Sequence, residues 1–169
     1  MHPTSVQIQF LQMLNENQRL IRKVCHLYGR DENGKDDLYQ EIVIQLWKSY
    51  GSFRGESKFS TWIYRIALNT AISDLRKKKR SIDLSFPEFI PKDDSATDDL
   101  TKEEHLKQLY TAIAKLSELE KAIVMLYLDE KSYDEMEEIL GINNGNLRVK
   151  MNRIKDKLKT ITKEEAYGT

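Results

Sequence analysis

Residues that form turns are scarce in this chain, and their scarcity constrains the fold more than any other feature. Only 7 glycines and 3 prolines occur among 169 residues, and the prolines stand at positions 3, 87 and 91. A fold built of many short strands needs far more turn residues. Apolar residues make up 40% of the chain and charged residues 32%, which suits helices with one buried and one solvated face. The sequence therefore predicts an all-α protein.

Charges are segregated along the chain, although the formal net charge is zero. Between Arg54 and Arg80 there are eight lysines and arginines and two acidic residues, and between Gly145 and Lys163 there are seven and one. Between Ser81 and His105 the balance reverses to two lysines and eight acidic residues. Local charge attracts a polyanion even where the total cancels. We therefore expect two basic modules that can approach nucleic acid, joined by an acidic linker.

The single cysteine, Cys25, excludes an internal disulfide and a cysteine-based zinc site. We expect it to be a small core residue, because nothing near it in the sequence would lower the pKa of its thiol. The three histidines lie at no ligand spacing, so we expect neither a metal nor a cofactor. The sequence contains no apolar run of membrane-spanning length and no secretory leader. The expected location is the cytoplasm, without membrane insertion.

Hydrophobic periodicity predicts three long helices in the first half of the chain. The first covers about Val6 to Tyr28 and is followed by a polar turn over Gly29–Lys35. The second carries its apolar stripe from Leu38 to Tyr50, and the third follows an N-cap at Ser60 and runs to about Arg80. The expected core residues of the third are Trp62, Ile63, Ile66 and Ala67. A separate polar face is expected to hold Arg65, Asn69, Ser73 and Arg76.

Capping boxes, in which Ser or Thr precedes a glutamate by three residues, mark helices in the second half. They are predicted at Thr101/Glu104, Ser117/Glu120 and Ser132/Glu135. The helix that begins after Ser132 should stop at Gly141, and Asn143 should cap a last helix that runs to about Thr162. Two helices joined by so short a turn are typical of a helix-turn-helix motif.

The last helix separates an apolar stripe from a polar, basic face. Its stripe consists of Leu147, Met151, Ile154, Leu158 and Ile161. Arg148, Asn152 and Arg153 point away from that stripe, and Arg and Asn can pair with guanine and adenine edges in the major groove. The flanking lysines would suit phosphates: Lys150, Lys155 and Lys157. A helical hairpin with a solvated basic face would have the same spacing, so this pattern favours DNA binding without excluding the hairpin.

Aromatic and basic residues alternate from Phe53 to Phe59 and continue into Trp62, Tyr64 and Arg65. Single-stranded nucleic acid is bound by cationic grooves with aromatic platforms for unpaired bases. The same aromatic side chains would fit a protein core, and for Trp62 the core is the favoured interpretation.

These motifs resemble those of the extracytoplasmic-function (ECF) sigma factors of bacterial RNA polymerase. Residues 37–69, and above all the run Phe-Arg-Gly-Glu-Ser-Lys-Phe-Ser-Thr-Trp-Ile-Tyr-Arg-Ile-Ala-Leu-Asn at 53–69, are similar to region two of that family. Residues 116–158 are similar to its region four. The resemblance implies two small helical domains, over residues 1–80 and 102–163, joined by an acidic linker over 81–101.

The resemblance also implies a function: a non-enzymatic sigma factor that binds core RNA polymerase and directs promoter recognition and transcription initiation. Docking on the clamp helices of the largest polymerase subunit would use Asp37, Gln40, Glu41 and Trp47. Melting and reading of the minus-ten element would use Arg54, Lys58, Phe59, Tyr64, Arg65, Asn69 and Arg76. Reading of the minus-thirty-five element would use Asn146, Arg148, Val149, Lys150, Asn152, Arg153 and Lys155. The implied partners are core polymerase and promoter DNA, and the family also allows an anti-sigma factor.

Three positions depart from the family pattern. Ser117 stands where the family usually has proline. Glu137 stands where a small alanine is usual, so that either the helices cross more loosely or the carboxylate reaches solvent. Val149 replaces a small polar residue, and its apolar side chain would favour a thymine methyl group.

Two other functions compete with this interpretation. A stand-alone helix-turn-helix regulator has no use for a single-strand reader such as residues 53–69. A nucleic-acid-processing enzyme would need a phosphate loop, clustered carboxylates or a Cys/His/Asp constellation, none of which the sequence contains.

Overall fold

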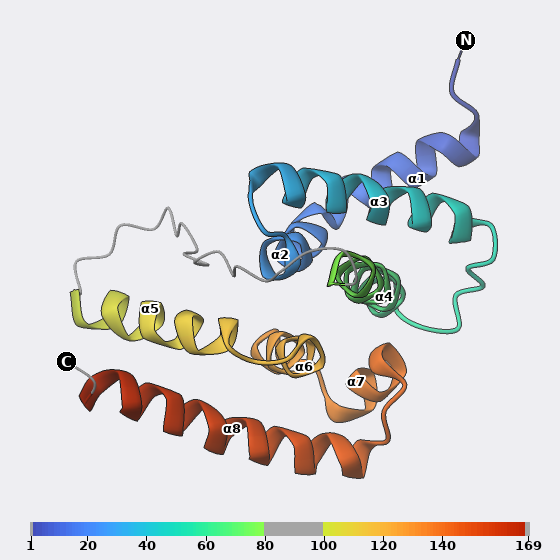
Figure 1. Cartoon of the computed structure of the whole chain (residues 1–169). Helices are drawn as coiled ribbons and strands as arrows, with labels where there is room; N and C mark the ends of the chain where they lie inside the picture. Colours follow the sequence, from blue (N-terminus) through green and yellow to red (C-terminus); the bar gives the residue numbers. More distant parts are fainter. Residues whose placement is uncertain (1, 80–99, 168–169) are drawn as a thin grey trace. The chain divides into compact units, whose positions relative to one another are not determined.

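The computed structural model describes residues 2–79 and 100–167, and these form two compact units. All regular structure in the described residues is α-helical, which confirms the predicted fold class. The N-terminal unit (residues 2–79) contains α1 (Ser5–Glu16), α2 (Gln18–Tyr28), α3 (Glu32–Tyr50) and α4 (Phe59–Lys79) (Figure 1). The C-terminal unit (residues 100–167) contains α5 (Leu100–Ala114), α6 (Glu118–Leu128), α7 (Tyr133–Leu140) and α8 (Asn144–Tyr167). The predicted acidic linker falls almost entirely on residues 80–99, which lie outside the described part.

The core of the N-terminal unit forms where α2, α3 and α4 pack on one another. Its largest fully buried side chains are Ile21, Val24, Ile42, Leu46, Ile63 and Leu68. On α4 the predicted core side is only partly correct, because Ile66 is half-buried. Tyr64, Leu68 and Ala71 are buried in addition to the other predicted residues. The buried side of α4 is therefore rotated about the helix axis relative to the predicted side.

The predicted single helix from Val6 to Tyr28 is wrong, because the chain breaks at Asn17 between α1 and α2. Asn17 has φ −112° and ψ 14°, outside the helical well. Its side-chain Nδ2 donates to the carbonyl of Met13 at 2.9 Å, and its backbone N–H also bonds into the last turn of α1. Asparagine side chains offer the backbone such alternatives to a continuous helix, and the sequence pattern did not reveal this one.

Two helix starts lie earlier than predicted. α3 begins at Glu32, inside the expected polar turn, because Asp31 caps it by accepting from the backbone N–H of Gly34 at 2.6 Å. α4 begins at Phe59, so Ser60 is already helical and is not the N-cap. The first helical bond there runs from the N–H of Trp62 to the carbonyl of Lys58, at 3.1 Å.

In the C-terminal unit α8 packs against α5, α6 and α7 (Figure 1). Their interface buries a shared set of side chains: Ala122, Ile123, Leu126, Met136, Leu147, Met151 and Ile154. α8 continues to Tyr167, beyond the predicted end at Thr162.

Two of the three predicted capping boxes are confirmed. At Ser117 and at Ser132 the hydroxyl accepts from the glutamate N–H three residues on, and the glutamate carboxylate accepts from the serine N–H at 2.9 Å. The third box is wrong in its boundary, because Thr101 is helical and so is not the N-cap of α5. Among the described helices, none is long and apolar enough to cross a membrane.

Candidate functional site

The outer face of α3 carries the four predicted docking residues, and all four are exposed: Asp37, Gln40, Glu41 and Trp47. The opposite face of α3 is buried through Leu38, Ile42 and Leu46. Ile44 lies among the exposed residues and is 46% exposed. Sequence reasoning missed Ile44 as a candidate. The signal for it was its angular position, since at 100° per residue it falls between Gln40 and Asp37.

Trp47 is also part of a connected set of aromatic rings. Its ring meets that of Phe10 edge-on with centroids 4.9 Å apart, so it ties α1 to α3. Phe10 in turn contacts Tyr50 at 5.3 Å. Trp47 nevertheless remains 43% exposed. One side of the indole is thus fixed by packing and the rest is accessible to a partner.

The basic and aromatic loop between α3 and α4 is anchored by its own aromatic residues. Phe53, Phe59 and Trp62 form a triangle with centroid distances of 4.6, 5.1 and 5.6 Å. Trp62 is 8% exposed, which confirms the core interpretation, and Phe59 is half-buried. The loop places Arg54 and Lys58 at the surface.

The outer face of α4 carries the predicted polar residues, and these are all exposed: Arg65, Asn69, Ser73 and Arg76. Tyr64 is different, since only 2% of it is exposed. At 100° per residue it lies among Ile63, Ala67 and Leu68 on the buried side. Its predicted direct contact with DNA is therefore wrong for this structure, in which Tyr64 is a core residue.

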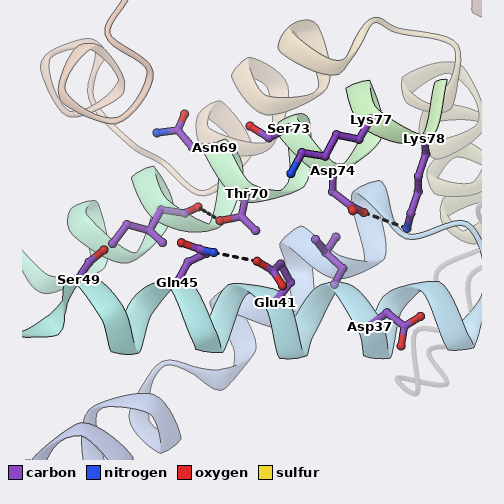
Figure 2. A pocket seen from close by; sticks show the side chains of 12 residues that line it. Asp37, Glu41, Gln45, Ser49, Asn69, Thr70, Ser73, Asp74, Lys77 and Lys78 are labelled. Atoms are coloured by element: carbon purple, nitrogen blue, oxygen red, sulfur yellow. Dashed lines mark hydrogen bonds and ion pairs between the residues drawn. The ribbon is translucent and has the colours of Figure 1, made fainter. Parts of the chain in front are cut away.

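A groove of about 710 Å³ runs between α3 and α4 and brings together residues predicted for two different roles. Glu41 from the docking set and Asn69 from the strand-reading set both line it. Figure 2 shows Glu41 and Gln45 at the edge of the exposed face of α3 that borders the groove, joined by a hydrogen bond of 2.8 Å, whereas the Asn69 amide points away from α3. Lys78 and Asp74 form an ion pair at 2.9 Å on α4.

The turn between α7 and α8 has the predicted helix-turn-helix form. Gly141 ends α7 in the left-handed region, with φ 68°, a conformation that favours glycine. Asn143 caps α8 as predicted, because its Oδ1 accepts from the N–H of Gly145 at 2.8 Å. Glu137 is exposed, as the second of the two expectations for it requires, and its Oε2 accepts from the backbone N–H of Asn144 at 3.0 Å. A side chain of α7 thus caps the start of α8.

All seven predicted minus-thirty-five residues are exposed on α8: Asn146, Arg148, Val149, Lys150, Asn152, Arg153 and Lys155. Val149 is 49% exposed, opposite the buried stripe. Two of the seven have aromatic neighbours that sequence reasoning missed. The Arg148 guanidinium lies 4.4 Å from the ring centre of Tyr133, and the Lys155 ammonium lies 4.8 Å from that of Tyr127.

Titratable groups in the two units have different environments. Burial raises the pKa of the Cys25 thiol to about 11, which fits the predicted core role. In the C-terminal unit burial opposes ionisation of Glu120, but hydrogen bonds from Ser117 and Lys157 outweigh it and lower the pKa of that carboxyl. The described residues contain no group of three or more His, Cys, Asp or Glu side chains that could hold a metal ion.

The chain matches two protein-family models, each within one unit. Residues 13–81 match Sigma-70 region 2, and residues 106–158 match Sigma-70, region 4. The ECF RNA polymerase sigma-E factor of Escherichia coli (strain K12) is 33% identical over 82% of this chain and 80% of its own. The ECF RNA polymerase sigma factor SigW of Bacillus subtilis (strain 168) is 28% identical over 82% of this chain and 81% of its own. The chain belongs to the ECF sigma factors.

Solved structures support the same fold for this sigma factor. The sigma factor RpoE of Bartonella quintana, crystallised with the anti-sigma factor NepR, has a TM-score of 0.74 at 20% identity, over 92% of this chain and 97% of that one. CnrH, in complex with the cytosolic domain of CnrY, has a TM-score of 0.64 at 18% identity, over 92% and 88%. As a member of this family, the protein binds core RNA polymerase and promoter DNA and directs promoter recognition and transcription initiation.

Proposed function

We propose that this sigma factor engages polymerase and promoter through three exposed surfaces. The outer face of α3 docks on core polymerase, through Asp37, Gln40, Glu41 and Trp47, with Ile44 added. The α3–α4 loop and the outer face of α4 melt and read the minus-ten element, through Arg54, Lys58, Phe59, Arg65, Asn69 and Arg76. The exposed face of α8 reads the minus-thirty-five element. The corresponding domains are residues 1–80 and 102–163, with the acidic linker over 81–101.

The main support for this docking surface is the exposure of two large apolar side chains on a helix face that is otherwise polar. Ile44 is 46% exposed and Trp47 is 43% exposed, with Gln40 and Glu41 beside them. Apolar anchors surrounded by polar groups are the usual composition of a protein–protein interface. Packing on Phe10 accounts for one side of the Trp47 indole and leaves the rest of it exposed.

Transcription from a promoter by purified core polymerase, with and without the full-length protein, tests the proposal. We expect Glu41→Lys to weaken binding to core polymerase by about ten-fold or more, because it reverses a charge on the docking surface. Glu16→Lys makes the same charge change on the exposed surface of α1 and is the matched control. Equal binding of core polymerase by both variants would contradict the docking assignment.

The rest of the proposal concerns the lack of catalytic activity, the cellular location and a further protein partner. We infer that it performs no chemistry of its own and leaves catalysis to the polymerase. We also infer that it acts in the cytoplasm, because its partners, core polymerase and promoter DNA, are there. An anti-sigma partner belongs to the proposal as well, because the RpoE of Bartonella quintana was crystallised with one. Such a partner would be expected to compete with core polymerase for this sigma factor.

A further inference from the structure

Two cations on α8 share an unusual environment. Arg148 lies over the ring of Tyr133, which opens α7, and Lys155 lies over the ring of Tyr127 at the end of α6. Positions seven apart differ by only about 20° around a helix and by about 10 Å along it. Arg148 and Lys155 therefore form one edge of α8, and each is supported by a tyrosine from another helix.

Hydrogen bonds restrict both cations further. The Arg148 Nε donates to Oδ1 of Asn144 at 2.9 Å, and the Asn144 Nδ2 donates to Oδ1 of Asp134 at 2.6 Å. The Asn144 amide thus stands between the guanidinium and a carboxylate. The Lys155 Nζ donates to the Tyr127 hydroxyl at 3.3 Å. Guanidinium has five N–H donors and ammonium three, so each group keeps donors for a further acceptor.

The partners of these two cations are neutral, and that separates them from Lys157. The Lys157 ammonium is 3.0 Å from the Glu120 carboxylate, which compensates its charge. A tyrosine ring or an amide limits the motion of a cation without cancelling its charge. Limiting motion beforehand reduces the ordering cost of binding. The Arg148–Lys155 edge therefore combines restricted side chains with cations whose direct partners are neutral.

We propose that Arg148 and Lys155 form a phosphate-binding edge of α8, held in place by Tyr133 and Tyr127 as positioning residues. This rests on the proposed minus-thirty-five surface and changes one role within it. Arg148 contacts the DNA backbone, and base edges are left to Val149, Asn152 and Arg153. A phosphate contact fixes the position of the protein on the duplex but carries no sequence information.

The test measures promoter binding by the holoenzyme as a function of salt, on a promoter and on a panel of its single-base-pair variants. Arg148→Gln and Lys155→Gln should each lower the log–log salt slope by about 0.9 and weaken binding to every duplex by the same factor. Lys157→Gln, the matched control, should change the slope clearly less. The edge assignment is overturned if Arg148→Gln relaxes preference at one base pair, or if Lys157→Gln lowers the slope as much as Lys155→Gln.

The positioning role of the tyrosines is tested by combining variants. Tyr127→Leu should weaken binding by about two- to five-fold at one salt concentration, and Tyr127→Phe, which keeps the ring, should weaken it less. In a Lys155→Gln background, Tyr127→Leu should have no further effect. Tyr133→Leu and Arg148→Gln should behave in the same way. Additive losses, with circular dichroism unchanged, would show that the tyrosines do not act through the cations.

A wrong assignment of the phosphate-binding edge can be distinguished from a wrong assignment of the whole minus-thirty-five surface. Arg153→Ala serves as the reference, since it should relax base preference on the same panel. If Arg153→Ala and the edge variants all leave binding unchanged, α8 does not contact the duplex and the proposed minus-thirty-five surface is wrong. If Arg153→Ala alone has its expected effect, only the edge is wrong.

Discussion

The two units of this sigma factor present their candidate residues in different ways. In the N-terminal unit the central aromatic residues Phe53, Phe59 and Trp62 pack against one another, and the polar candidates are spread over exposed parts of α3, the α3–α4 loop and α4, where Glu41 and Asn69 border a groove. In the C-terminal unit the candidate residues lie along the convex surface of one helix, where tyrosines and amides support individual cations. Basic side chains beside aromatic residues suit a flexible single strand. A fixed helix surface suits a duplex whose shape is set in advance. The comparison therefore predicts that the units differ in what stabilises them and in which step of initiation they serve.

The largest expected effect concerns the aromatic core of the N-terminal unit. Trp62→Ala removes a ring that contacts both Phe53 and Phe59, and we expect it to lower the free energy of unfolding by about 3–5 kcal/mol. Chemical denaturation followed separately in each unit, for example by hydrogen exchange, measures the loss. Trp47→Ala, at the exposed end of the same aromatic set, should cost clearly less. If the C-terminal unit loses protection to the same extent, the two units do not unfold independently.

The next effect separates strand capture from duplex reading. Asn69→Ala should impair opening of a closed promoter, because its amide can read the edge of an unpaired base. Arg153→Ala should cost about 1–3 kcal/mol of promoter binding and relax preference at one upstream base pair. Open-complex formation is measured on a duplex and on a template already mismatched across the minus-ten element. The mismatch should rescue part of the Asn69→Ala defect and none of the Arg153→Ala defect. Equal rescue of both variants would contradict the assignment of strand capture to the N-terminal unit and duplex reading to the C-terminal unit.

A smaller effect tests the polar connection at the helix-turn-helix. Glu137→Ala removes the carboxylate that accepts from the N–H of Asn144, so we expect a loss of about 1 kcal/mol in the stability of the C-terminal unit. Glu137→Gln keeps an oxygen acceptor in that place and should retain most of the stability. Thermal unfolding of the full chain, compared among the three proteins, measures both. Equal stability of the alanine variant and the parent would show that solvent replaces the cap without loss.

The smallest expected effect concerns the alkylation rate of the Cys25 thiol, which should be low in the native protein. Burial raises the pKa of Cys25 to about 11, so at pH 8 only about one thiol in a thousand is ionised and reactive. Alkylation by iodoacetamide should therefore be slow in the native protein, rise as the pH approaches 11, and become fast on unfolding. Trp62→Ala should speed the reaction at pH 8, and Glu137→Ala should not. Fast alkylation of the parent protein at pH 8 would contradict the buried environment of Cys25.

Sequence reasoning predicted the C-terminal unit better than the N-terminal one, and the reason is the range of the interactions. Ser117, Ser132 and Asn143 cap their helices through bonds that span two or three residues, so a local pattern is enough to find them. The contact of Arg148 with Tyr133 spans fifteen residues and two helices. Such a pair has no signature in spacing, and only the fold brings it together.

In the N-terminal unit, tertiary packing determines which side of α4 is buried, and the sequence pattern did not predict that side correctly. Apolar or aromatic residues occupy six of the seven positions from Trp62 to Leu68, so periodicity alone did not reveal which side of α4 is buried. The structure buries Tyr64 and leaves Ile66 half-buried, the reverse of what was predicted for these two residues. The exposed row of Arg65, Asn69, Ser73 and Arg76 was predicted correctly, because polar side chains three or four apart mark a solvated face directly.

The carboxylate at the start of α8 has a consequence for where DNA can lie. The first turn of a helix is usually an attractive place for a phosphate, because its N–H groups and dipole are positive. Here Glu137 already occupies an N–H of that turn, and Asp134 adds a second carboxylate beside it. Both repel a phosphodiester, so they disfavour a backbone that approaches end-on. The register of α8 on the duplex would then be selected by repulsion at one end of the helix as well as by attraction along its side.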